Sequence, residues 1–231
     1  MYRWLWVLYL AMALTLVGYA AETDTKKPVL DGSTVSTQET SLGNVMTDAL
    51  RHATGADIAI MHAMAFTEKA QLDLNAPADD HAIRDTLSLP TDKIAVLSMP
   101  PAILRKVMER AVSRLPGTNV AFLQVSGLEV TYDPAKPKYE RVKEIKIGGK
   151  TINLTDRTTL YKVAMPAVLA KGAVGYILEF SDMVMRSMQM SDTTLLDAVK
   201  QELTKAPLNV PTDARLIPVP PAKAAPHTKP A

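Results

Sequence analysis

The sequence predicts a single mixed α+β domain in which helices and hairpin strands follow one another irregularly. Of its 231 residues, 47% are hydrophobic, which is enough to bury a core and excludes wholesale disorder. Segments with helical spacing alternate with short apolar runs, but without the regular strand–helix–strand rhythm of a parallel sheet. Tight turns such as Gly148–Gly149 favour hairpins. Together these patterns are typical of an α+β fold.

Four segments carry the signals of helices. The first follows Thr40–Ser41, a Ser/Thr cap, and ends near Gly55. Pro100 and Pro101 favour the start of another, because proline fits the first helical turn. Ser191–Asp192 is predicted to cap the last one. The expected helices span residues 41–53, 78–87, 102–115 and 193–204.

The expected strands are apolar runs bounded by turn residues. In the longest run, Gln124, Ser126 and Gly127 interrupt the apolar pattern, which indicates a bulge or a close backbone approach. We expect these polar positions to be structural rather than ligand-binding. The expected strands span residues 57–61, 93–98, 120–132, 141–147, 150–153 and 161–165.

The two ends of the chain are predicted to lie outside the domain. Residues 1–21 combine one positive charge, an apolar run and small residues at the expected cleavage site, which is the pattern of a secretory signal peptide. We therefore expect an exported protein, periplasmic or secreted. The alternative is an uncleaved membrane anchor, because the apolar run is just long enough. Residues 22–37 are expected to form a flexible leader and the Pro/Ala-rich residues 218–231 a disordered tail, which leaves 38–217 as the domain.

The charge and the cysteine count exclude several classes of function. Lys+Arg 26 against Asp+Glu 24 gives a net charge of +2, too little for a nucleic-acid partner. The absence of cysteine excludes disulfides, zinc knuckles and thiolate nucleophiles. The four histidines show no metal-ligand spacing. We therefore expect no cofactor and no resident catalytic metal.

Four segments, in order, resemble the C-terminal domain of the 5'-nucleotidase family, which includes cyclic phosphodiesterases and UDP-sugar hydrolases. They read ETSLGNVMTDALR with GADIAI (39–51 and 55–60), LSLP before the next strand (87–90), FLQVSGLEVTYD (122–133) and YKVAMPAVLAKGAVGY (161–176). Residues 214–217 are similar to the closing strand of the family. The resemblance covers roughly residues 38–217 and implies the α+β fold of that domain.

The resemblance also implies what this segment does not do. In the family, a preceding metallophosphatase domain holds two metal ions that activate water for phosphoester hydrolysis. The residues before Glu39 carry none of the motifs of that domain. We therefore expect the chain not to hydrolyse phosphoesters alone, and a separately encoded metallophosphatase is a candidate partner.

The family's C-terminal domain supplies a nucleotide pocket in which two aromatic rings sandwich the base and an Arg, an Asn and an Asp bind polar groups. Carried over by position, that Asn corresponds to His62, that Arg to Thr67, and the Asp to Val174. The two ring positions hold Thr91 and Val168. Positions that are kept are Arg51, if it is the family's helix-end arginine, with Gly172, Gly175 and Tyr176.

These replacements predict a degenerate pocket. Each base–aromatic stack is worth about 1–3 kcal/mol, so losing both rings weakens nucleotide binding by roughly 2–6 kcal/mol. The sequence therefore predicts weak nucleoside or nucleotide binding at most. Tyr176 is either a substitute ring or, more in keeping with its pattern, a core residue.

Three other interpretations stay open. A dense methionine cluster lies in residues 183–190, and soft sulfur ligands of this kind in an exported protein suit Cu(I). Met61–His62 with Met64 would add an imidazole and more sulfur. The same methionines equally serve as gap-filling core residues. The polar stretch 67–80 is either a partner-binding loop or a solvated one, and the chain as a whole is alternatively a purely structural or interaction protein. The candidate Cu(I) ligands are Met183, Met185, Met188 and Met190.

Overall fold

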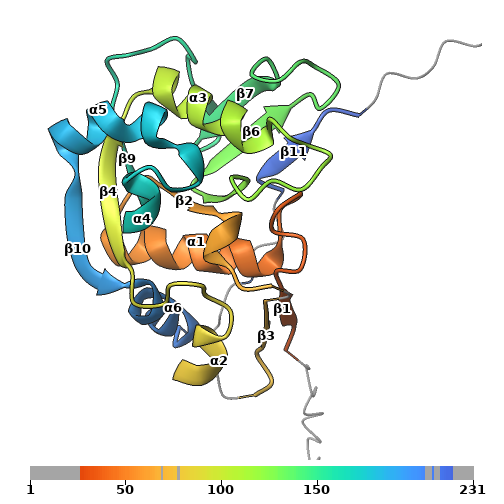
Figure 1. The fold of residues 1–231 in the computed structure, drawn as a ribbon, viewed down its shortest axis with the longest axis vertical. Helices are drawn as coiled ribbons and strands as arrows, with labels where there is room; N and C mark the ends of the chain where they lie inside the picture. Colours follow the sequence, from red (N-terminus) through yellow and green to blue (C-terminus); the bar gives the residue numbers. More distant parts are fainter. Residues whose placement is uncertain (1–26, 69, 77–78, 206–209, 211–213, 221–231) are drawn as a thin grey trace, which may run out of the picture.

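The computed structural model of the chain describes residues 27–68, 70–76, 79–205, 210 and 214–220. The predicted signal peptide (1–21) and most of the predicted tail (218–231) lie outside the described residues. Within the described part, the strands form three sheets of two, five and four strands, and helices pack against them (Figure 1). The predicted α+β class is confirmed. No helix in this part is long and apolar enough to cross a membrane.

The five-stranded sheet forms the centre of the domain. Its strand order is β10-β4-β9-β2-β5, and the neighbours are antiparallel except for the parallel pair β2–β9. Every residue of β2 is buried, as the apolar run predicts. The strands are β2 (Ile58–His62), β4 (Lys93–Met99), β5 (Leu123–Ser126), β9 (Tyr161–Pro166) and β10 (Gln189–Thr194).

Two smaller sheets flank the central one. The four-stranded sheet has the order β11-β6-β7-β8, and β11 joins it in parallel with β6, which gives the closing strand expected from the resemblance. The other sheet is the antiparallel pair β1–β3. The strands are β1 (Val29–Asp31), β3 (Gln71–Asp73), β6 (Leu128–Tyr132), β7 (Val142–Ile147), β8 (Lys150–Thr151) and β11 (Leu216–Pro218).

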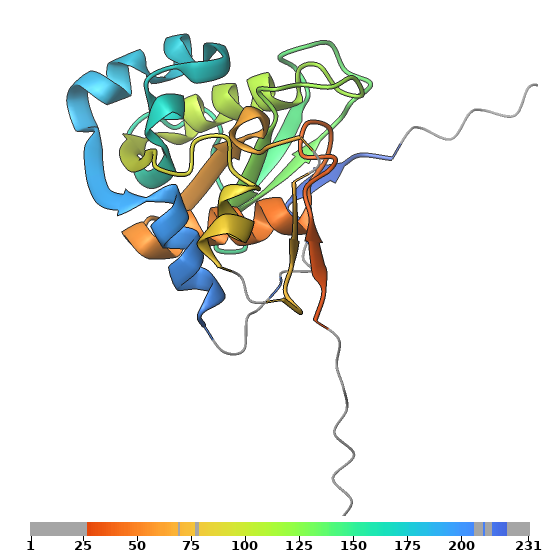
Figure 2. The same cartoon turned by 60° about the horizontal axis from the view of Figure 1, so that its bottom comes forward.

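Helix α1 is the central helix, and α6 lies across it (Figure 2). Thr40 caps α1 by accepting a hydrogen bond from the Gly43 amide at 3.0 Å, and Gly55 ends it at φ +60°. Both ends are the predicted ones. The helices are α1 (Ser41–Thr54), α2 (Asp80–Arg84), α3 (Pro101–Val112), α4 (Ala167–Ala170), α5 (Ile177–Ser187) and α6 (Leu195–Leu203), with 3₁₀ turns η1 (Ala63–Ala65) and η2 (Ala173–Gly175).

Three predicted elements differ from the structure. The long strand 120–132 is two strands, β5 and β6, because Gly127 turns the chain at φ +79° and a Cβ there would overlap the Asp57 carbonyl. The helix expected over 78–87 is the shorter α2. The last helix is capped by Thr194 rather than by Ser191–Asp192, because residues 189–194 pair with β4 as strand β10.

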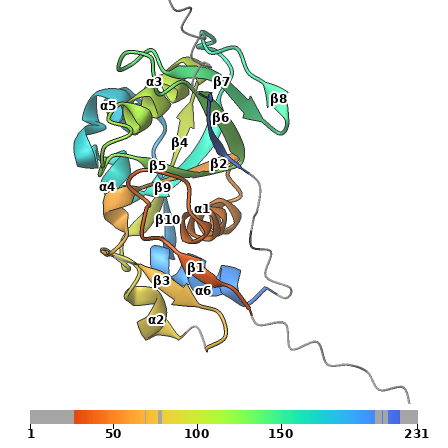
Figure 3. The same ribbon diagram turned by 90° about the vertical axis from the view of Figure 1, so that its right-hand side faces the viewer.

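The described part of the expected leader is ordered. Leu30 is fully buried, and β1 pairs with β3 beside the α2 and α6 end of the domain (Figure 3). The side chain of Gln124 reaches this segment and binds Val35 and Gln38. Residues 29–37 thus belong to the folded domain, and the prediction of a flexible leader over 22–37 is wrong for them.

Candidate functional site

A pocket of about 310 Å³ lies at the ends of β2 and β9, between the loop that precedes β4 and the helical turns α4 and η2. This volume is at the lower end for a small-molecule site. Its polar wall is made by His62, Ser88 and Asp92. The remaining wall is aliphatic and contains Met64, Ala65, Leu89, Pro166, Val168, Ala173 and Leu195.

His62 is the buried polar group of this pocket. It ends β2 and is only 3% exposed. Its Nδ1 atom has no hydrogen-bond partner, which is unusual for a buried polar atom. Burial lowers the pKa of His62 from 6.5 to about 4, so the imidazole is neutral at pH 7. An unpartnered buried nitrogen on a pocket wall is a group that a bound ligand can satisfy.

The buried imidazole makes the stability of the domain depend on pH. Because the pKa of His62 is lower in the folded state than the unfolded value of 6.5, stability is complete above pH 6.5 and is lost as the pH falls toward 4. Between pH 7 and pH 4.5 we expect a loss of about 2–3 kcal/mol from this group. Urea unfolding of the wild type and of His62→Asn at both pH values measures the difference.

His81 supplies the matched control for this titration. Its side chain is 83% exposed, so His81→Asn should leave the pH dependence unchanged. Equal pH slopes for the wild type and His62→Asn would show that the imidazole is not held neutral by burial.

Asp92 connects two walls of the pocket. Its Oδ2 accepts a hydrogen bond from the Val168 amide at 3.0 Å, and its backbone oxygen accepts one from the Leu195 amide at 2.9 Å. These bonds join the segment that holds Thr91 to the start of α4, where Val168 lines the pocket. Thr91 itself is exposed beside Asp92 and does not line the pocket.

A strained turn follows Val168 and closes one side of the pocket. Gly172, Val174 and Gly175 have positive φ values of 98°, 48° and 85°. Valine in the left-handed region is strained, and such strain is common at binding sites. The Arg110 guanidinium holds this turn by donating to the Val174 carbonyl at 3.0 Å. Ala173 lines the pocket, whereas Gly172, Val174 and Gly175 are not in its lining and set the course of the backbone around it.

The remaining predicted site residues lie elsewhere. Thr67 uses its hydroxyl to donate to the Asp85 carbonyl and does not line the pocket. Tyr176 is fully buried, stacks on Phe180 with ring centroids 5.3 Å apart and donates to the Ala121 carbonyl at 2.7 Å. Burial raises the pKa of the Tyr176 phenol well above 10. Its ring thus belongs to the core and offers no face to a ligand.

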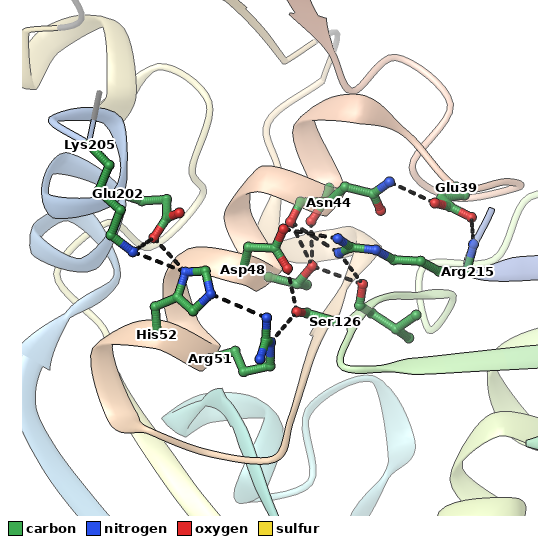
Figure 4. A network of polar contacts seen from close by, with 12 residues as sticks. Glu39, Asn44, Asp48, Arg51, His52, Ser126, Glu202, Lys205 and Arg215 are labelled. Atoms are coloured by element: carbon green, nitrogen blue, oxygen red, sulfur yellow. Dashed lines mark hydrogen bonds and ion pairs between the residues drawn. The ribbon is translucent and has the colours of Figure 1, made fainter. Parts of the chain in front are cut away.

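Arg51 lies in a buried polar network that sequence reasoning missed (Figure 4). Its Nε donates to the Ser126 hydroxyl at 2.7 Å, and Ser126 donates in turn to Asp48. Asp48 forms an ion pair with Arg215 at 2.9 Å. Glu39 accepts the backbone amides of Arg215 and Leu216 at 2.6 and 2.9 Å, which fixes the start of β11. The network joins α1, β5 and β11, so Arg51 has a structural place there.

The methionines of the Met-rich segment are divided between the core and the surface. Met183 and Met188 pack against the core. Met185 and Met190 are 86% and 44% exposed. In the described residues no group of three or more His, Asp or Glu side chains is positioned to hold a metal ion. The partly buried methionines fill gaps in the core, as such side chains commonly do.

Fold and pocket together define the class: a mixed α+β domain with a ligand-sized pocket at the strand ends. The family follows from comparison with known proteins. The chain belongs to the family of the 5'-nucleotidase C-terminal domain, which matches residues 17–180. It is 30% identical over 160 residues to the trifunctional nucleotide phosphoesterase protein YfkN of Bacillus subtilis (strain 168), covering 64% of this chain and 10% of that protein. It is 27% identical over 161 residues to a 5'-nucleotidase-related protein of Glossina morsitans morsitans, covering 60% and 28% of the two chains.

Solved structures share the fold. The 5'-nucleotidase precursor from Thermus thermophilus superposes with a TM-score of 0.66 at 21% identity, covering 84% of this chain and 38% of that one. The sulfate thiohydrolase SoxB of the same organism superposes with a TM-score of 0.56 at 14% identity, covering 78% and 32%. The chain thus spans well under half the length of each of these four relatives.

Proposed function

We propose that this domain is a non-catalytic module that binds a nucleoside or nucleotide weakly in the pocket beside His62. The observation that carries the proposal is the composition of the pocket wall. The pocket keeps a ligand-sized volume and an unpartnered buried ring nitrogen, His62 Nδ1. At Val168, where the family has an aromatic ring, the wall is aliphatic. Such a pocket encloses a base by contact but lacks the stacking that gives high affinity.

We further propose that the domain acts beside a separately encoded metallophosphatase after export. The described residues contain no metal-binding cluster of acidic and histidine side chains, so the phosphoester chemistry would come from the partner. A phosphatase assay on the purified chain, with and without Mn²⁺ or Zn²⁺, tests the non-catalytic part. Metal-dependent turnover by the pure chain would contradict it.

Binding is tested by thermal shift and calorimetry with adenosine, AMP and UDP-glucose. We expect small stabilisation by adenosine or AMP at millimolar concentration. Loss of this shift in His62→Asn, but not in His81→Asn, would support the pocket as the site. No shift with any of the three ligands would contradict nucleoside binding and would favour a purely structural or interaction role.

Restoring the ring at position 168 should raise affinity. In Val168→Phe, we expect binding of adenosine to strengthen by about 2 kcal/mol, or roughly 30-fold, because a base–aromatic stack is worth about 1–3 kcal/mol. Calorimetric titration measures the change. The matched control is Val168→Leu, which adds apolar bulk without a ring. An equal gain in the control would attribute the effect to pocket size, and no gain in either would remove the pocket as a nucleoside site.

A further inference from the structure

A second cleft, of about 560 Å³, lies away from the pocket, against helix α3. One side is formed by α3, which contributes Arg105 and Lys106. The facing side is the loop between β8 and β9, which contributes Leu154 and Arg157. Tyr139, from the loop before β7, also lines the cleft. Helix α5, which lies beside α3 in Figure 1, contributes Glu179.

The cations of this cleft have no acidic partners. Among the described residues, no carboxylate lies within ion-pair distance of Arg105, Lys106 or Arg157. Three unpaired positive charges from two separate elements thus face one hollow. Such an arrangement attracts a multiply charged anion, and arginine forks fit phosphate oxygens in pairs.

The two carboxylates of the cleft differ in their partners. Glu109 is 3% exposed and accepts the backbone amides of Arg141 and Val142 at 2.9 and 3.0 Å. Glu179 faces the Arg110 guanidinium, with its Oε1 4.0 Å from the Nη1 of Arg110, and its Oε2 is buried without a hydrogen-bond partner. The lining holds three cations and two carboxylates, and Arg110, which lies outside the lining, offsets the charge of Glu179, so the field of the cleft is positive.

The mouth of the cleft also offers an apolar surface. Tyr139 is 56% exposed although it is a large ring, and its backbone is held at φ +68°. A non-glycine residue in this region is uncommon, and a bulky one is strained. Leu154 adds an aliphatic side chain to the same cleft. An inorganic ion would make no use of these two groups, whereas the organic part of a larger ligand would contact them.

We propose that this cleft binds a small phosphorylated organic molecule. Arg105, Lys106 and Arg157 hold the phosphate, and Tyr139 with Leu154 contacts the organic part. A phosphate dianion gains about twice the attraction of a single carboxylate from the same three cations, so these cations favour a phosphate. The site is separate from the pocket beside His62 and does not depend on its proposed function.

Phenyl phosphate is the probe for a calorimetric titration of the full chain, because it has a ring and a phosphate but no nucleoside. Inorganic phosphate and benzoate each present one half of its chemistry. We expect phenyl phosphate to bind at least tenfold more tightly than either, and its binding to weaken as NaCl is raised from about 0.05 to 0.5 M because salt screens the charges. No binding of phenyl phosphate, or equal binding of benzoate, would overturn the proposal.

Variants locate the site. Arg105→Gln/Arg157→Gln should weaken phenyl phosphate binding at least tenfold. The matched control is Arg84→Gln/Arg114→Gln, which removes the same charge from two exposed arginines outside the cleft. Equal loss in both variants would mean attraction by net charge alone and would overturn the site.

A variant of Tyr139 tests whether the cleft binds the organic part of a ligand in addition to its phosphate. Tyr139→Asn removes the ring and is tolerated at positive φ, so we expect weaker binding of phenyl phosphate and unchanged binding of inorganic phosphate. Circular dichroism confirms that each variant is folded. Unchanged binding of phenyl phosphate in Tyr139→Asn would overturn the assignment of the organic part.

Discussion

Replacing Arg215 with Met should lower the free energy of unfolding by about 3–5 kcal/mol, because it leaves a buried carboxylate without its partner. The Arg215–Asp48 pair is 2.9 Å long, and the two side chains are only 8% and 11% exposed. The guanidinium also donates to the Val125 carbonyl at 2.9 Å. In a domain of this size each kcal/mol lowers the midpoint temperature by about 2–4 °C, so a fall of roughly 10 °C is expected.

A surface ion pair provides the control for Arg215→Met. Lys200 and Asp80 form a pair at 2.7 Å, but their side chains are 44% and 53% exposed. Lys200→Met should therefore cost no more than about 1 kcal/mol. Urea unfolding followed by circular dichroism measures both variants. A loss below about 1 kcal/mol for Arg215→Met would mean that Asp48 is compensated by water or by other donors, and the network would not be a stabilising centre of the fold.

The elements that the sequence predicts well are those with local signals. Helix α1 has a capping Thr40, an apolar stripe and a terminal Gly55, and all three have the predicted roles. Helix α5 has neither a capping side chain nor a terminal glycine, and while Phe180 is its one buried residue, Leu178 is 85% exposed. Strands β1 and β3 have three residues each, and their pairing joins segments far apart in the chain. Long-range pairing, which no local pattern encodes, decided the elements that were missed.

Some residues of the candidate site are predicted correctly from the sequence and others are not. The resemblance placed His62 and Val168 in one pocket, and the structure brings them together. Thr67 and Tyr176 were carried over by alignment of short motifs, but their side chains are engaged by Asp85 and Ala121. The Asp48–Arg215 pair joins residues 167 positions apart, so spacing along the chain gives no sign of it.

Gln124→Met is expected to have the second large effect on stability. Gln124 is fully buried in β5, and its amide serves a segment that is distant in the sequence. Its Oε1 accepts the Thr40 amide at 3.0 Å, and its Nε2 donates to the carbonyls of Val35 and Gln38 at 3.1 and 2.8 Å. Methionine fills a similar volume but leaves these backbone groups unpaired. Because each buried unpaired group costs about 1–3 kcal/mol, we expect a total loss of about 3–4 kcal/mol after partial relaxation.

The segment that loses protection in Gln124→Met shows whether Gln124 stabilises the N-terminal segment alone or the whole domain. Gly43 has no side chain where a Cβ would overlap Gln124, so the amide is held against the start of α1 and cannot easily move to new partners. Hydrogen exchange should therefore rise most over residues 29–40 in Gln124→Met, while β9 stays protected. Gln71→Met, at an exposed position in β3, serves as the control and should change stability by less than about 0.5 kcal/mol. A uniform rise across the domain would mean that Gln124 stabilises the sheet as a whole, and the N-terminal segment would then be held by β3 and the packing of Leu30 rather than by this amide.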